Sequence, residues 1–284
     1  MKKICFITCA ILLCASLAFG DEVEDKLPPM ATQELKANTR EMIRSGINSD
    51  DAIKMTKLML ENQFRHQLIL EAQHIIMNAQ REGLPVGPIM NKAQEGMTKH
   101  VQHKSIVQAM ETVRSRYAFA YQQAKTITQS RAQMHQIGNT IAQGLAAGMN
   151  QEDVGRIMQR FQHRAQEMTR ADAEELARGT FMATRTMARL GVSSEATTEL
   201  VCQALLNRYT AREMEAMRNS FMTRSRNENP TNLAKSYANE IQDGKGAGSP
   251  GSSGMGGAGM SGGHDGSSGH GGSGGNGGSG GGHK

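Results

Sequence analysis

Tryptophan is absent from this 284-residue chain, and only four tyrosines and seven phenylalanines occur. β-Branched residues are also sparse, and because aromatic and β-branched residues favour strands, this composition argues against a sheet protein. Proline is limited to six residues, none inside a long periodic segment. The abundant residues are Ala, Gln, Met, Arg, Glu and Leu, all of which favour helices. The composition therefore predicts an all-α body.

A strong charge of either sign is also missing. The formal net charge is +5, and two of the positive charges, on Lys2 and Lys3, belong to an N-terminal segment that we expect to be removed. Recognition of nucleic acid depends on a concentrated basic face. The charge balance therefore predicts a protein that does not bind nucleic acid.

Residues 1–20 have the pattern of a secretory signal peptide. Two lysines precede the apolar run Ile4–Leu17, and small residues lead to a cleavage position before Asp21, with a cut after Ala18 as the alternative. The run is short for a membrane span, which needs about 20 residues, so cleavage would leave no stable transmembrane segment. The bulky residues before Cys14 do not fit a lipoprotein signal. We expect an exported protein of the periplasm or the extracellular space.

The exported chain would lack an internal disulfide. The sequence has four cysteines, and cleavage would remove Cys5, Cys9 and Cys14, which leaves Cys202 alone. Cys202 lies among apolar residues of a helical pattern, where a buried small hydrophobic side chain is expected. An intermolecular disulfide or a reactive thiol is the alternative.

The rest of the chain divides into three parts. Residues 21–30 contain Pro28-Pro29 and are expected to form a short linker, and residues 31–242 form a helical body. Residues 243–284 are about half glycine, with much serine. Such a segment buries too little apolar surface to offset its backbone entropy, so we expect a disordered C-terminal tail.

Four glycine corners punctuate the body, at Gly46, Gly83, Gly148 and Gly191. An apolar residue follows each glycine, and a capping residue or proline comes next. Glycine takes the left-handed conformation that ends a helix, and the apolar residue folds back onto the last turn of that helix. Asn48, Asn150 or Ser193 then caps the next helix. The pattern predicts tight helix–helix corners.

Apolar residues recur at matching offsets after three of these glycines. The matching sets are Phe64, Val101 and Tyr209, then Ile69, Ile106 and Met214, then Ile76, Val113 and Phe221. This recurrence indicates an internal repeat with an insertion before Gly148. Because each helical hairpin exposes an apolar face that stacking covers, we predict stacked helical hairpins, either α-solenoid-like or as an irregular helical bundle.

The periodic apolar pattern places helices along the whole body. The predicted ranges are 31–45, 49–62, 65–82, 86–99, 104–147 with a break near 126–129, 151–168, 171–190, 194–208, 210–225 and 231–242. The 20 methionines of the chain fall mostly at core positions of these helices and suit a core that is poor in aromatics. Binding of Cu(I) by their thioethers is the alternative.

The stretch Glu82-Gly83-Leu84-Pro85, followed by Asn91–Met97 and Ile106–Glu111, resembles a motif of uncharacterised exported bacterial helical proteins. Its pattern is GLP, a K-x-x-E-G step and an I-x-x-A helix, and the resemblance covers about residues 40–125. The resemblance implies a helical fold and an envelope location, and it carries no assigned activity. The corners at Gly148 and Gly191 depart from the motif, because both lack the proline and the K-x-x-E-G step.

Histidines of the tail are the candidate metal ligands. The set comprises His264, Asp265, His270 and His283. Flexible imidazoles bind Zn, Cu or Ni loosely, and wide spacing among glycines offers no preformed geometry. We therefore expect no cofactor beyond weak transition-metal binding by the tail. In the body, His100 and His103 straddle a predicted turn, and His66 and His103 share a repeat offset near helix starts.

Arg156, Arg160 and Arg164 recur every four residues and share one helix face. They are candidates for contact with an anionic partner such as acidic lipid or polysaccharide. Glu152 and Glu167 lie within helical reach and partly neutralise them. An ordinary solvated face is the alternative.

Motifs of catalysis are missing. The sequence has no His-Glu-x-x-His run, no Cys-x-x-Cys pair and no nucleophile elbow. We therefore expect a non-enzymatic interaction or scaffold protein of the bacterial cell envelope, whose partner is an envelope protein or an anionic envelope component. Metal handling by the tail and a periplasmic helical chaperone are the alternatives.

Overall fold

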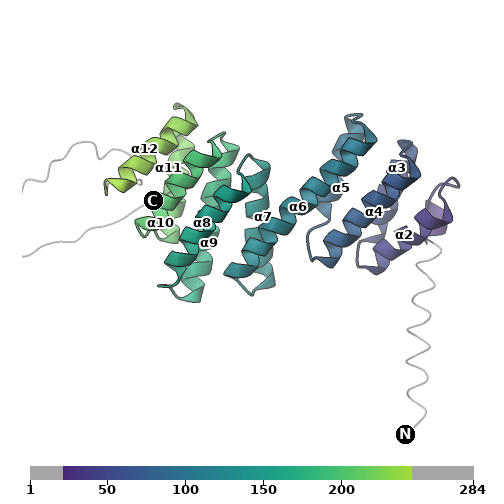
Figure 1. The fold of residues 1–284 in the computed structure, drawn as a ribbon, viewed down its shortest axis with the longest axis horizontal. Coiled ribbons are helices and arrows are strands. Elements are labelled where there is room, and N and C mark those ends of the chain that lie inside the picture. The colour runs from purple at the N-terminus through teal and green to yellow at the C-terminus, as the bar shows by residue number, and fades with distance from the viewer. Residues whose placement is uncertain (1–21, 245–284) are drawn as a thin grey trace, which may run out of the picture. The chain divides into compact units, whose positions relative to one another are not determined.

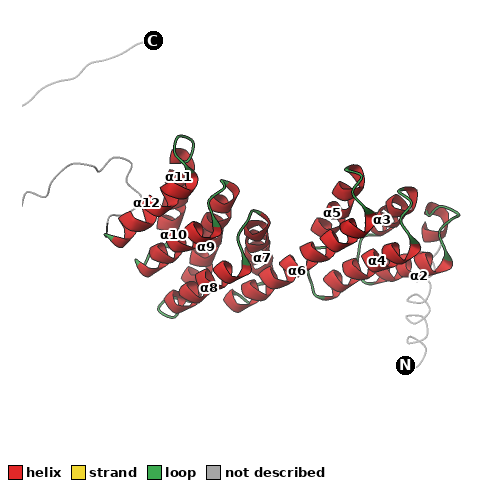
Figure 2. Cartoon of the chain, turned by 45° about the horizontal axis from the view of Figure 1, so that its top comes forward, coloured by secondary structure: helices red, strands yellow, loops and turns green. Residues whose placement is uncertain are grey.

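The computed structural model describes residues 22–244, and within them the chain is helical (Figure 1, Figure 2). The helices are α2 (Gln33–Arg44), α3 (Ser49–Glu61), α4 (His66–Arg81), α5 (Gly87–Thr98), α6 (His103–Ile127), α7 (Arg131–Ala146), α8 (Gln151–Ala165), α9 (Arg170–Arg189), α10 (Ser194–Leu206), α11 (Ala211–Arg224) and α12 (Pro230–Gln242). No strand occurs in residues 22–244, so the predicted all-α class is confirmed. The expected signal peptide and residues 245–284 of the expected tail lie outside the described residues.

Helix ends follow the capping signals of the sequence. Asn48, Asn150 and Ser193 accept hydrogen bonds from backbone N–H groups three residues ahead, at 3.2, 2.7 and 3.3 Å. The long helical stretch breaks at Thr128, where the backbone is extended, and Ser130 caps α7. Every helix predicted from the sequence is present, with ends within a few residues of those expected.

All four corner glycines have left-handed backbones, with φ of 96° at Gly46, 73° at Gly83, 115° at Gly148 and 83° at Gly191. In each corner the N–H of the next residue donates to the carbonyl five residues earlier, at 2.9–3.2 Å, as in a Schellman motif. The four donors are the buried residues Ile47, Leu84, Met149 and Val192. The same local geometry therefore ends four helices of the body.

Three further corners use a residue other than glycine. Gln63, His100 and Arg208 have φ of 58°, 51° and 60°. The residues that follow them, and that close the same backbone bond, are Phe64, Val101 and Tyr209. The apolar residues at the first of the three matching offsets therefore each close a second corner, which follows the glycine corner of the same repeat. The residues at the other two offsets, Ile69, Ile106, Met214, Ile76, Val113 and Phe221, are buried.

The helices form two layers joined by these corners (Figure 1). Contacts run through α2, α4, α6, α7, α9 and α11 in one layer, and through α3 and α5 and then α8, α10 and α12 in the other. Apart from α6, which also reaches α9, each helix packs mainly against helices one or two places away along the chain. This is the order of stacked helical hairpins, in which each hairpin covers the apolar face of the next.

One continuous core runs through the stack and is rich in methionine. Its members include Met55, Met59, Met110, Met158, Met187 and Met217, all buried as predicted. Two glycines allow close approach between helices. A Cβ atom at Gly96 would lie 2.6 Å from Ile106, and one at Gly138 would lie 2.6 Å from the ring of Tyr121. The core is thus close-packed even though it has few aromatic residues.

Residues 22–27 are packed against the body, which corrects the expectation of a linker there, whereas Met30 is 69% exposed. The chain is helical over 22–26, and Val23 and Leu27 are 0% and 4% exposed in a cluster with an isoleucine of α3. Glu24 forms an ion pair with Lys36 of α2 at 2.5 Å. Val23 and Leu27 have helical spacing, and their burial depends on contact with apolar side chains of α2 and α3.

Candidate functional site

A polar groove lies between α8 and α10. Its main cavity has a volume of about 550 Å³, and a smaller cavity of about 160 Å³ continues it toward the ends of both helices. The main cavity is lined from α8 by Arg156, Gln159, Arg160 and His163, and from α10 by Glu195, Thr198, Glu199 and Cys202. Both sets have helical spacing, so one face of each helix forms a wall of the groove.

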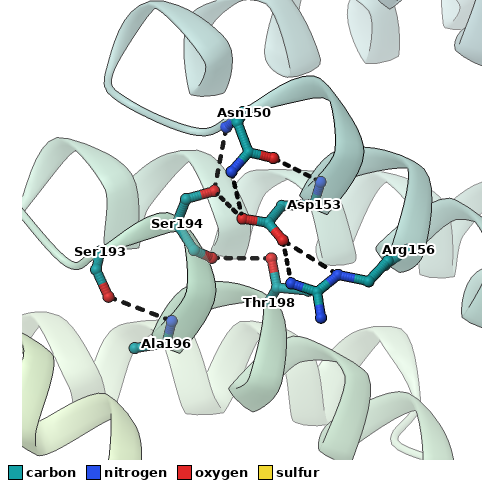
Figure 3. Close-up of polar contacts among 7 residues, drawn as sticks. All are labelled: Asn150, Asp153, Arg156, Ser193, Ser194, Ala196 and Thr198. Carbon is teal, nitrogen blue, oxygen red and sulfur yellow. Dashed lines mark hydrogen bonds and ion pairs between the residues drawn. The ribbon is translucent and has the colours of Figure 1, made fainter.

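At one end of the groove, Asp153 joins two glycine corners (Figure 3). Its side chain is buried and accepts hydrogen bonds from Asn150 Nδ2 at 2.8 Å, from Arg156 Nε at 3.1 Å and from Ser194 Oγ. Ser194 Oγ in turn accepts the backbone N–H of Asn150 at 3.1 Å. The first turns of α8 and α10 are thus tied together, which fixes the spacing of the groove walls.

The Asp153 carboxyl is ionised at neutral pH. Burial alone would raise its pKa, but hydrogen bonds from Ser194, Arg156 and Asn150 outweigh that cost and lower the pKa of Asp153. The resulting carboxylate holds the guanidinium of Arg156 at the edge of the groove. Because this pair is already formed, the charge of Arg156 is only partly available to a ligand.

The arginine stripe of α8 is therefore less free than its spacing suggests. Arg156 pairs with Asp153, and Arg164 pairs with Glu167 at 3.4 Å. Arg160 lies between them, is exposed, and forms no ion pair within residues 22–244. Of the three arginines, Arg160 is the one that presents an uncompensated charge to the groove.

The opposite wall carries carboxylates. Glu195 and Glu199 are exposed on α10 and form no ion pair in the described part of the chain. Thr198 is buried between them, and its hydroxyl donates to the carbonyl of Ser194 at 2.9 Å. Burial raises the pKa of the Cys202 thiol, although the nearby Arg160 opposes this effect. Cys202 therefore stays protonated at neutral pH and acts as an apolar part of the α10 wall.

The two walls present opposite charges to one shared space. Arg160 supplies hydrogen-bond donors from α8, whereas Glu195 and Glu199 supply acceptors from α10. A ligand that is anionic along its whole length would be attracted to one wall and repelled by the other. A peptide segment with side chains of both signs would meet both walls favourably.

The metal ligands predicted from the sequence, His264, Asp265, His270 and His283, lie outside the described residues. Within residues 22–244, no group of three or more His, Cys, Asp or Glu side chains is placed to hold a metal ion. His66 and His103 begin α4 and α6, as their shared offset predicts. His66 Nε2 lies 2.8 Å from Glu34, and His103 stacks on Phe64 with 4.0 Å between ring centroids.

The sequence predicts the basic face of α8 but not the wall opposite. Glu195, Glu199 and Cys202 have the same spacing on α10 as Arg156, Arg160 and His163 have on α8. That matched spacing is the available signal. The matched spacing becomes informative only once α8 is known to pack directly on α10, although α9 lies between them in the sequence. This pairing depends on the two-layer stack.

Within residues 22–244, no helix combines the length and the apolar character that crossing a membrane requires. Comparison with protein-family models, with curated proteins and with solved structures finds no match to this chain.

Proposed function

We propose that this chain is a non-enzymatic scaffold of the bacterial cell envelope that holds a protein partner in the groove between α8 and α10. The observation that carries the proposal is the opposite charge of the groove walls, with Arg160 on one side and Glu195 and Glu199 on the other. A protein segment offers charges of both signs at short intervals, whereas acidic lipid or polysaccharide offers mainly one. The partner we propose is therefore an envelope protein.

The construction of the groove supports a binding role. Asn150, Asp153 and Ser194 link the first turns of α8 and α10, so both walls stand on rigid helices and little ordering is required when a partner binds. The cavity of about 550 Å³ is of a size that holds several side chains. Charges at such a surface select the partner and speed its association more than they add affinity.

The envelope location rests on the N-terminal pattern of residues 1–20. A fusion of this segment to alkaline phosphatase without its own signal tests it, because that enzyme needs disulfides that form only outside the cytoplasm. We expect phosphatase activity from the fusion, and its loss when Leu12→Arg interrupts the apolar run. An inactive fusion would contradict export.

Charge reversal tests the groove itself. Gln159, which is exposed on the α8 wall, is replaced by a photo-crosslinking amino acid in the full chain in its native cells. We expect Arg160→Glu and Glu199→Lys each to reduce the resulting protein adduct several-fold, because each reverses a charge that the partner meets. A crosslinker at Gln122, exposed on α6 outside the groove, serves as the positional control.

The pattern of the two reversals distinguishes the kinds of partner. Binding of a uniformly anionic partner would decrease with Arg160→Glu and increase with Glu199→Lys. The fraction of the protein that floats with vesicles containing phosphatidylglycerol would change in the same directions. That pattern, or adducts that neither reversal changes, would contradict a protein partner of mixed charge. Arg212→Glu, at an exposed position of α11, is the matched charge control and should leave the adduct unchanged.

A further inference from the structure

The insertion that precedes Gly148 in the repeat gives the two layers unequal numbers of helices within residues 22–244. The α6–α7 hairpin places two successive helices in one layer, while the other layer passes directly from α5 to α8. The principal contacts of α7 are with α6 and α9, both in its own layer. Within residues 22–244, the position opposite the α6–α7 seam therefore has no helix of its own.

Two neighbouring cavities mark this position, which we call the insertion groove. One, of about 220 Å³, lies among α5, α6 and α7, and the other, of about 380 Å³, lies among α6, α7 and the start of α8. Arg116 lines both cavities. The insertion groove therefore runs from α5 across the α6–α7 seam to α8, with Arg116 at its centre.

The lining of the insertion groove suits a helix. The residues from α5, which lie on one face of that helix, are Pro88, Asn91, Lys92 and Glu95. The seam contributes Ala142 and Ala146 from α7 and the buried Tyr117 from α6. Small side chains on α7 permit a close approach of helix axes, which lie about 8–10 Å apart in packed proteins.

Arg116 is the cation of this groove that lacks a carboxylate partner within residues 22–244. The nearby carboxylates are already engaged, Glu95 with Lys99 at 2.6 Å and Glu111 with Arg114 at 2.6 Å. Hydrogen bonds from the two neighbouring lysines lower the pKa of Glu95 to about 2. Both acids therefore stay ionised and paired, which leaves Arg116 available to an acidic side chain from outside.

We infer that the insertion groove is a docking site for an amphipathic α-helix of a partner protein, which completes the shorter layer and sets an acidic side chain against Arg116. Helix-in-groove recognition of this kind combines an apolar face with a few charged anchors. Residues 245–284 are mostly glycine and serine, a composition that disfavours a helix, so the tail does not suit the site. The insertion groove is separate from the α8–α10 groove and does not depend on the function proposed there.

Selection from a displayed library of three-turn amphipathic helices tests the inference. The library carries Glu, Gln or Lys at one central position and is selected against the full chain. We expect enrichment of Glu, and at least tenfold weaker binding of the enriched peptide to Ala146→Arg, which fills the groove. Ala146 is exposed, so this change spares the core. Ala216→Arg, at an exposed position of α11 outside the groove, should bind as the unaltered chain does.

Reversal of the central charge makes the test specific. Selection against Arg116→Glu should enrich Lys in place of Glu, and circular dichroism should show that each variant keeps its helices. The inference fails if no peptide is enriched, if Ala146→Arg leaves binding unchanged, or if the preference for Glu survives Arg116→Glu. It also fails if the full chain forms a dimer in sedimentation that Ala146→Arg dissociates, because a second copy would then fill the groove.

Discussion

At the scale of single residues, glycines of the core set how closely helices approach. A Cβ at Gly138 would lie 2.6 Å from Cδ2 of Tyr121, whose hydroxyl is held by Asn139 at 3.0 Å. We expect Gly138→Ala to lower the unfolding free energy by about 1–2 kcal/mol, since overpacking outweighs the gain in helix propensity. Thermal unfolding followed by circular dichroism measures this. A Cβ at Gly155 would have no neighbouring atom within 4 Å, so Gly155→Ala should raise the unfolding free energy by up to about 1 kcal/mol. Equal effects of the two substitutions would show that close packing at Gly138 does not control stability.

Asp153 makes the stability of the fold depend on pH. Its pKa in the folded state lies below the unfolded value of about 3.9, so its hydrogen bonds stabilise the fold above that pH, and their contribution is lost as the pH falls through the folded pKa. Asp153→Ala should cost about 1.5–3 kcal/mol at pH 7. Urea unfolding should show this difference shrinking toward pH 2. A difference that does not change with pH would assign the effect to packing.

At the scale of helices and their corners, backbone handedness sets the stability of the connections. Gly83 has φ of 73° with nothing within 4 Å of its missing Cβ, so Gly83→Ala should cost about 1 kcal/mol from left-handed strain alone. Gln63 is exposed and has φ of 58°, so Gln63→Gly should stabilise by up to about 1 kcal/mol. Thermal melts should shift in opposite directions. Shifts of the same sign would show that side-chain contacts, rather than the backbone angle φ, determine how much these corners contribute to stability.

At the scale of the whole molecule, contacts between near neighbours make stability local. The α2–α5 group joins the later helices through α6, which lies between them in Figure 1, and stacks of this kind lose structure in parts. Met59→Ala in α3 removes a fully buried side chain and should cost about 2–5 kcal/mol. Hydrogen exchange read by mass spectrometry should rise more in α2–α5 than in α10–α12. A uniform rise would mean that the stack unfolds as one cooperative unit.

The features that the sequence predicts correctly are those that arise within a few residues. The glycine corners, the caps at Asn48 and Asn150 and the break at Thr128 depend on neighbouring side chains and backbone. The left-handed corner at Gln63 cannot be predicted in this way, since glutamine has no preference for that conformation. The packing of residues 22–27 has no local signal either, because Val23 and Leu27 are buried by apolar side chains of α2 and α3.

The helical class, the extent of each helix and the glycine corners between them follow from local sequence, because propensity, capping and left-handed glycine act over a few residues. Which helix faces meet depends on the tertiary structure. It brings the carboxylates of α10 opposite Arg160, joins Asp153 to Ser194, and leaves Arg116 in the insertion groove, which runs from α5 across the α6–α7 seam to α8. These outcomes depend on contacts between residues distant in the chain, whose energies have no local signature until the two layers are assembled.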